Sequence, residues 1–224
     1  MSSRMKPHLQ RLAKADPGVQ LGLIGCTLAS VIILLHVLTN RQIHDNQEQD
    51  LMLKFKEALA GQVFDNNPLQ EGTHVPDQTG LIDMTRYAAR NGDELVAWLI
   101  LATTPEGYSG NIRLLVALNP EGQILAVRLI DHHETPGFGD RIAWPRSAWL
   151  GQFQGLHAAA LKEQDWNFKP LGGRFDQVTG ATLTPRAVLR AVRRILERTE
   201  ADNHEKNRAL QPNPGTVPSI PWTP

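Results

Sequence analysis

The stretch NIRLLVALNPEGQILAVRLI, residues 111–130, decides the fold class. Its two apolar segments, 111–119 and 124–130, are rich in branched side chains and have the length of β-strands. The residues PEGQ between them have the composition of a turn. A third segment of the same kind, ELVAWLIL, precedes them at 94–101. Strands joined by such short connections pair with their sequence neighbours, so we expect an antiparallel meander.

A helix is predicted after these strands, from residue 184 to about residue 200. Thr184 can cap its start, and Pro185 fits the first helical position. Its apolar residues repeat along one face: Val188, Leu189, Val192, Ile195 and Leu196. Its arginines fall mostly on the other face, which is more typical of a solvated surface than of a lipid-binding or partner-binding one. Together these elements predict an α+β domain, an antiparallel sheet with packed helices.

A single transmembrane helix is predicted ahead of this domain. Residues 21–38, LGLIGCTLASVIILLHVL, carry no formal charge if the histidine is neutral, and as a helix they cover about 27 Å of a bilayer core about 30 Å thick. Basic residues precede the run and polar and acidic residues follow it, which places the N-terminus in the cytoplasm. A cleaved signal peptide is the alternative, but its apolar region would be shorter and a small-x-small site would follow. We therefore expect an uncleaved anchor at 21–40 after a cytoplasmic segment at 1–20.

The rest of the chain divides by composition. QEQDLMLKFKEALA, residues 47–60, has apolar side chains at helical spacing, and Gly61 can end that helix. Residues 62–80 contain Asn, Pro and Gly without periodicity and are interpreted as a loop. We expect a helix and linker over 41–80, the main domain over 81–200 and a disordered, polar, proline-rich tail over 201–224.

Charge and cysteine content exclude several classes of function. Lys and Arg number 23 together, as do Asp and Glu, and no basic stripe interleaves with aromatic residues, so no nucleic-acid partner is expected. The single cysteine, Cys26, lies in the predicted anchor. The chain therefore cannot form internal disulfides, cysteine-ligated zinc sites, iron–sulfur clusters or covalently attached c-type haem. Any redox chemistry needs a cofactor held in another way.

One candidate binding segment is HHETPGFG, residues 132–139, directly after a predicted strand. A helical zinc motif needs a second histidine four residues after the first, where this sequence has Gly137 and an intervening proline, so no metal site is predicted. Such a loop can approach a flat ligand closely, with His133, Glu134 and Thr135 as polar contacts. A purely structural turn explains the same residues.

The second candidate segment is TGATLTP, residues 179–185, at the predicted helix start. Thr184 has a role as a cap, whereas Thr182 has none and stands beside the small residues Gly180 and Ala181. The helix N-terminus directs amide donors and the positive end of its dipole toward this turn, which favours a bound phosphate. These residues fit an anion site, and they fit a simple helix cap as well.

A longer match carries more information than these local patterns. DQVTGAT, residues 176–182, fills every specified position of the flavinylation pattern Asp-x-x-(Ser/Thr)-Gly-Ala-Thr. An N-terminal anchor, GYSGNI at 107–112, HHETPGFG at 132–139 and TGATLTP at 179–185 follow in order. The chain thus resembles the G subunit of Rnf-type ion-translocating electron transport complexes over most of residues 20–200. The related C subunit of sodium-translocating NADH:quinone reductase shares these signatures, but the shorter chain looks more like the Rnf subunit.

The resemblance implies a flavoprotein. FMN would be joined through a phosphoester bond to Thr182, the final threonine of the pattern, by a separate flavin transferase that uses FAD as donor. The flanking cofactor-site residues implied by motif position are Asp176, Thr179, Gly180, Ala181, Leu183 and Thr184. We add His133, Glu134 and Thr135 as expected flavin contacts, and we expect neither a catalytic side chain nor a bound metal.

The function implied by the resemblance is that of an electron-carrying subunit in a complex that couples electron transfer to ion translocation. As a non-autonomous redox subunit of a translocase, it would need other membrane subunits as partners, in addition to membrane lipid. Its FMN-binding domain would face the periplasm from a bacterial inner membrane. The alternatives are a membrane-tethered FMN-binding sensor or assembly factor outside any electron relay, and a flavin-free scaffold.

Overall fold

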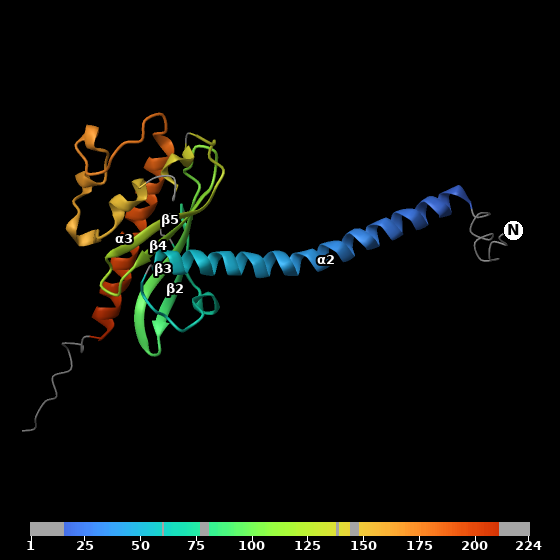
Figure 1. Cartoon of the computed structure of the whole chain (residues 1–224), viewed down its shortest axis with the longest axis horizontal. Helices are drawn as coiled ribbons and strands as arrows, with labels where there is room; N and C mark the ends of the chain where they lie inside the picture. The colour runs from blue at the N-terminus through green and yellow to red at the C-terminus, as the bar shows by residue number, and fades with distance from the viewer. Residues whose placement is uncertain (1–15, 60, 77–80, 138, 144–147, 211–224) are drawn as a thin grey trace, which may run out of the picture. The chain divides into compact units, whose positions relative to one another are not determined.

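The computed structural model describes residues 16–59, 61–76, 81–137, 139–143 and 148–210. It forms two compact units that divide between Asp50 and Leu51, within the long helix α2, Pro17–Ala58 (Figure 1). The expectations for residues 1–15 and for residues 211–224 lie outside the described residues.

The first unit contains the apolar part of α2. Its segment Pro17–Thr39 has a mean hydropathy of 2.4 and no buried residue in its most apolar stretch, so the described residues contain one helix that is long and apolar enough to cross a membrane. At about 1.5 Å per residue it exceeds the bilayer core, about 30 Å thick. The hydroxyls of Thr27 and Ser30 donate to backbone carbonyls about one turn earlier, at 2.9 and 2.8 Å. These polar groups therefore need no water, as a lipid environment requires.

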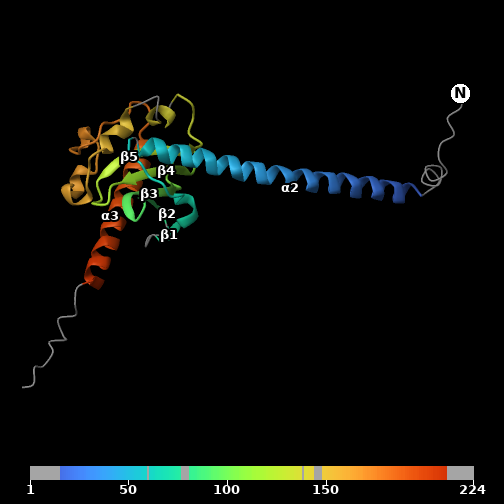
Figure 2. The ribbon, with the colours of Figure 1, turned by 60° about the horizontal axis from the view of Figure 1, so that its bottom comes forward.

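A five-stranded antiparallel sheet forms the centre of the second unit, in the order β1-β2-β3-β4-β5. The strands are β1 Thr73–Val75, β2 Asp83–Asn91, β3 Glu94–Thr104, β4 Ile112–Leu118 and β5 Ile124–His132. Figure 2 shows the strand labels in this order across the sheet. The three predicted strands are β3, β4 and β5, and the expected α+β fold with an antiparallel meander is confirmed.

The turn between β4 and β5 explains their tight pairing. The amide of Gly122 donates to the carbonyl of Asn119 at 3.0 Å, and the amide of Gln123 donates to the Asn119 side chain at 2.7 Å. Gly122 has φ +88°, a left-handed conformation that favours glycine. Local residue chemistry therefore fixes the register of the two strands that define the fold.

Both faces of the sheet contribute to a buried core, which is why its central strands β3 and β4 are mostly apolar. In β4, Leu114 and Val116 face the core formed with α3, Leu183–Leu210, and with residues 139–175. Leu115, between them, belongs to the second core on the opposite face. Here Phe55 and Ala58 at the end of α2, with Leu59 directly after it, pack against a sheet surface of small and apolar residues: Ala89, Ala97, Leu99, Leu115, Ala117 and Ala126.

The boundaries of the second unit differ from the expected ones. The loop expected at 62–80 contains a 3-10 helix, Pro68–Glu71, and the edge strand β1, and the compact unit begins at Leu51 rather than near residue 81. Helix α3 continues to Leu210, well beyond the expected end near residue 200. Asp202 helps to fix this extension, because its carboxylate pairs with Arg86 of β2 at 3.2 Å and with Arg198 at 3.1 Å.

Between β5 and α3, residues 139–175 contain a series of short 3-10 helices. These are Gly139–Ile142, Trp149–Phe153, Ala158–Ala160, Glu163–Asp165 and Lys169–Leu171. Aromatic rings hold the segment together: Phe153 lies 5.0 Å from Phe175, and Trp149 and Trp166 lie 5.6 Å from Phe153 and Phe175 respectively. This buried cluster fixes the point from which the turn before α3 departs.

Candidate functional site

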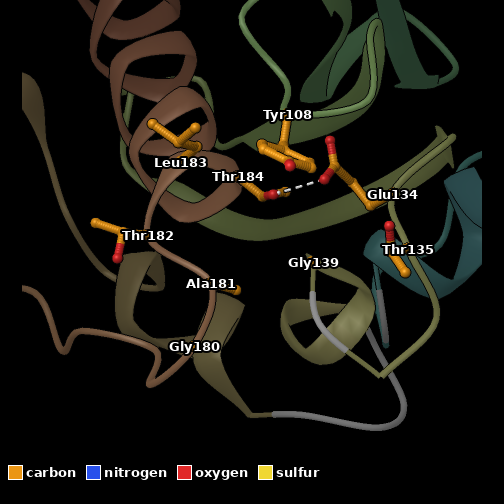
Figure 3. Close-up of a pocket in the computed structure, with 9 residues that line it drawn as sticks. All are labelled: Tyr108, Glu134, Thr135, Gly139, Gly180, Ala181, Thr182, Leu183 and Thr184. Carbon is orange, nitrogen blue, oxygen red and sulfur yellow. Dashed lines mark hydrogen bonds between the residues drawn. The ribbon is translucent and has the colours of Figure 1, made fainter.

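A cavity of about 490 Å³ opens where four connecting segments meet (Figure 3). Its lining residues are Tyr108, Glu134, Thr135, Gly139, Gly180, Ala181, Thr182, Leu183 and Thr184. They come from the loop between β3 and β4, the loop after β5, the turn before α3 and the first turn of α3. Small-molecule sites typically enclose about 300–1,000 Å³. Three sequence motifs that lie far apart in the chain therefore contribute to a single cavity of ligand size.

The start of α3 differs from the predicted one. The helix begins at Leu183, and the amide of Arg186 donates to the carbonyl of Thr182 at 3.3 Å. Thr182 thus stands at the position just before the helix, and Pro185 lies within the first turn, where a missing amide leaves no helical bond unmade. The prediction that Thr184 caps the helix is wrong, because its hydroxyl donates to Oε2 of Glu134 at 2.8 Å.

Glu134 is the polar centre that brings three of these segments together. Its side chain is 6% exposed and accepts hydrogen bonds from the Thr184 hydroxyl and, at 3.2 Å, from the Ser109 amide. Two glycines make room for it. A Cβ atom at Gly139 would lie 2.6 Å from Oε2 of Glu134, and one at Gly107 would lie 2.8 Å from Oε1. The buried carboxyl group is thus hydrogen-bonded to two of the segments that surround the cavity, and the two glycines leave it enough space.

The turn before α3 is built from small residues for a conformational reason. Gly180 has φ +82°, and a Cβ atom there would meet no atom within 4 Å. Its backbone geometry, rather than lack of space, therefore favours glycine. Ala181 is buried, whereas Thr182 is half-buried and lines the cavity. The turn accordingly presents the Thr182 side chain beside the cavity on a backbone that few other sequences would adopt.

The start of the same turn is anchored through Asp176. Its amide donates to Oε1 of Gln152 at 2.7 Å, and its carbonyl accepts a hydrogen bond from Nε1 of Trp149 at 2.7 Å. Its carboxylate pairs with Lys169 at 2.6 Å, although both side chains are more than half exposed. Because the anchoring bonds involve the backbone, they hold the turn in place and leave the carboxylate on the surface.

The structure does not gather all the predicted residues in one place. Asp176 and Thr179 line a separate groove on the outer side of the turn, together with Lys169, Pro170, Gln177 and Gly180. His133 is exposed and lines neither hollow, although Thr135 beside it lines the cavity. The remaining predicted residues line the cavity: Glu134, Thr135, Gly180, Ala181, Thr182, Leu183 and Thr184.

Two cavity residues escape the sequence-based prediction of the site, Tyr108 and Gly139. Both belong to motifs that carry the resemblance, GYSGNI and HHETPGFG, although the sequence alone assigns neither a role. Motif membership is therefore the signal that could have found them. Tyr108 differs from a core aromatic residue because 69% of its surface is exposed.

The chemistry of the lining residues fits FMN. The first turn of α3 directs backbone amides and the positive end of its dipole toward the end of the cavity that holds Thr182, which suits a phosphate group. The opposite wall combines an aromatic ring, Tyr108, with the polar side chains of Glu134 and Thr135. Within the described residues, no group of three or more His, Cys, Asp or Glu side chains could hold a metal ion. The cavity thus offers a phosphate end and an end for a planar, partly polar ring.

Comparison with known proteins identifies the family. Residues 107–197, which include the whole cavity, match the model of the FMN-binding domain. The chain is 41% identical over 181 residues to the G subunit of the ion-translocating oxidoreductase complex of Stutzerimonas stutzeri, covering 80% of this chain and 78% of that protein. The protein of the same name from Vibrio cholerae serotype O1 is 35% identical over 199 residues, covering 88% of this chain and 94% of the relative.

The chain belongs to the family of G subunits of ion-translocating oxidoreductase complexes. A further member of this family, from Salmonella typhi, is 38% identical over 179 residues, 79% of this chain and 86% of its own. The resemblance drawn from the sequence motifs is thereby confirmed, as is the presence of an FMN-binding domain. The match to the FMN-binding domain supports FMN as the cofactor.

Proposed function

We propose that this protein is the electron-carrying subunit of a membrane complex that couples electron transfer to ion translocation, with FMN joined covalently to Thr182. The observation that carries this proposal is the placement of the Thr182 side chain. It lies half-buried at the start of the long helix α3, beside a cavity of about 490 Å³ inside the FMN-binding domain.

The structure separates Thr182 from the other two threonines of the motif. Thr184 is buried and its hydroxyl already donates to Glu134 at 2.8 Å. Thr179 is exposed in the outer groove. Thr182 lines the cavity and is only half-buried, a combination that neither of the other two threonines has. Its hydroxyl is therefore the best placed to bear a group that fills the cavity.

Attachment would follow the chemistry of a phosphoryl transfer. The Thr182 hydroxyl oxygen forms a bond to the FMN phosphorus of FAD, the phosphoanhydride bond breaks, AMP leaves and the hydroxyl proton is lost to solvent or to the flavin transferase. The exposed segment around Asp176 and Thr179 would be the surface that the transferase recognises. The threonine oxygen acts in this modification and has no role in later electron transfer.

The chain's own residues would then hold the phosphate and the ring. The first turn of α3 stabilises a phosphate by about 0.3–2 kcal/mol, depending on exposure. Thr135 offers a hydroxyl to the polar part of the ring or to the ribityl chain, a role that His133 is less well placed to share. When bound, FMN supplies transfer of electrons singly or in pairs. The protein contributes a tether, orientation and the electrostatic surroundings of the ring.

The proposed location follows from the N-terminal helix. The apolar segment Pro17–Thr39 would cross the bacterial inner membrane, with the basic N-terminal residues in the cytoplasm and the FMN-binding domain in the periplasm. One helix cannot form an ion pathway, so the other subunits of the complex would conduct the ion and exchange electrons with the flavin. The names of the relatives, which describe an oxidoreductase complex, support this assignment.

Intact-mass measurement after co-expression with a flavin transferase tests the attachment. We expect an increment of one FMN on the wild-type chain, its loss in Thr182→Ala and its retention in Thr135→Ala. Thr135 is a matched control because it is a threonine with an exposed side chain in the same cavity. An increment that persists in Thr182→Ala contradicts the proposal. The electron-carrying role further requires that the complex reoxidise the attached flavin after its reduction. Recovery of the visible absorbance of oxidised flavin during turnover would reveal this step.

A further inference from the structure

The loop between β3 and β4 is held firmly from both sides. At its start, the amide of Glu106 donates to the buried hydroxyl oxygen of Thr104 at 3.4 Å. The Glu106 carboxylate forms ion pairs at 3.5 Å with two arginines of α3, Arg190 and Arg194. Farther along, the Ser109 amide donates to Glu134 at 3.2 Å. The backbone of the loop is thus tied to α3 and to the loop after β5.

Close packing of the backbone adds to these ties. A Cβ atom at Gly107 would overlap the carbonyl oxygen of Gly110 and lie 2.8 Å from the side chain of Ile112. Gly110 itself has φ +120°. Because neighbouring atoms fill the space beside Gly107, the backbone on either side of Tyr108, in the middle of the loop, has little freedom to move.

The side chain of Tyr108, by contrast, is left without a packed environment. It is 69% exposed, whereas the rings of Phe55, Phe153, Phe168 and Phe175 are at most 1% exposed. It lines the cavity, and among the described lining residues it is the one aromatic side chain. Leu183, the residue after the proposed attachment point, also lines the cavity and is 51% exposed. A fixed backbone therefore presents an unpacked ring to a cavity of ligand size (Figure 3).

We propose that Tyr108 is a positioning residue that stacks on the isoalloxazine ring of the attached FMN. The inference rests on the proposed attachment at Thr182 and deepens it by assigning the contact that holds the ring. A planar ring against Tyr108 would cover the exposed aromatic surface at low entropic cost, because the loop is already fixed. The interaction uses the face of the tyrosine ring and does not require its hydroxyl group.

Two spectroscopic properties follow from stacking, and they respond differently to substitution. Immobilisation of the flavin ring gives visible circular dichroism, which any stacked aromatic side chain preserves. Quenching of flavin fluorescence by electron transfer needs an oxidisable ring, which tyrosine provides and phenylalanine does not. Tyr108→Phe should therefore keep the circular dichroism but raise the fluorescence. Tyr108→Ala should lose the circular dichroism as well as the quenching.

The test uses full-length, flavinylated protein purified in detergent. With Tyr108→Ala, we expect the ratio of immobilised to released flavin ring to fall about two- to twelvefold, the range that aromatic pairs contribute. The amplitude of the visible circular dichroism measures that ratio, because the variant has no tyrosine at this position to quench the fluorescence. Tyr87→Phe serves as the matched control, because it changes the second tyrosine of the chain in the same way but at β2, where its ring contacts Phe55 at 5.3 Å. We expect Tyr87→Phe to leave the flavin signals unchanged.

The mass spectrum separates failure of this inference from failure of the proposed attachment. If the FMN increment is present and both Tyr108 variants keep wild-type fluorescence lifetimes and circular dichroism, stacking on Tyr108 is wrong while the attachment stands. If Tyr87→Phe changes the signals as much as Tyr108→Phe, the assignment to Tyr108 is also wrong. If wild-type protein carries no FMN increment after co-expression with the transferase, both proposals fall together.

Discussion

Removal of the Thr184 hydroxyl should destabilise the FMN-binding domain more than the loss of an ordinary hydrogen bond. Thr184→Val keeps the size and branching of the side chain but leaves Oε2 of Glu134 without the donor now 2.8 Å away. Glu134 is 6% exposed, so water replaces the lost donor poorly. A hydrogen bond to a charged group contributes about 1.5–3 kcal/mol. For a domain of this size the unfolding temperature should fall by about 3–12 °C.

Thr199→Val is the matched control for this substitution. Thr199 is also buried on the same helix, and its hydroxyl donates to the backbone carbonyl of Ile195 at 2.8 Å. Since that carbonyl remains within the helix ladder, the loss should be only about 0.5–1.5 kcal/mol. Thermal unfolding of the full-length chain in detergent, followed by tryptophan circular dichroism, measures both. A Thr184→Val shift no larger than the Thr199→Val shift would refute the reasoning.

Two further substitutions and one pH titration test other parts of the structure. Asp202→Ala should lower the free energy of unfolding by about 1.5–3 kcal/mol, because Arg86 and Arg198 lose the partly buried carboxylate that they share, and an unchanged thermal midpoint would contradict this. Gly107→Ala should cost about 1–3 kcal/mol by overpacking, measured in the same way, and should release the β3–β4 loop. Burial raises the pKa of Tyr87 above 10.0, so its contribution to the free energy of unfolding is fully present below pH 10 and should be lost as the pH rises through the folded-state pKa. Tyrosinate absorbance and thermal midpoints, measured over the same pH range, test this, and a midpoint independent of pH above 10 would refute it.

The apolar strands were predictable because their pattern is local. Segments largely buried on both faces, such as β3 and β4, contain runs of mostly apolar residues rich in Leu, Ile and Val. Strand β2, with the sequence DMTRYAARN, has no such run, and pairing with β3 rather than its own composition makes it a strand. Strand β1 has three residues, too few to form a pattern. The extension of α3 likewise depends on a contact between Asp202 and Arg86, which lie 116 residues apart.

The site was predictable as a motif but not as a set of contacts. The small residues of TGATLTP indicate an accessible Thr182, but the bond between Thr184 and Glu134 joins residues 50 positions apart and leaves no local trace. His133, Glu134 and Thr135 form one group in the sequence only because they are consecutive. Leaving a strand, consecutive side chains point in different directions, so Glu134 is buried, Thr135 lines the cavity and His133 lies outside it.

Peptide mapping of the chain isolated from native membranes tests the central claim most directly. Cleavage after Arg174 and Arg186 releases residues 175–186, FDQVTGATLTPR, which contain all three threonines of the motif. Fragmentation of this peptide assigns an attached flavin to one of them. We predict one FMN in phosphoester linkage on Thr182, with Thr179 and Thr184 unmodified. FMN on another threonine, or on no peptide of the chain, would contradict the account.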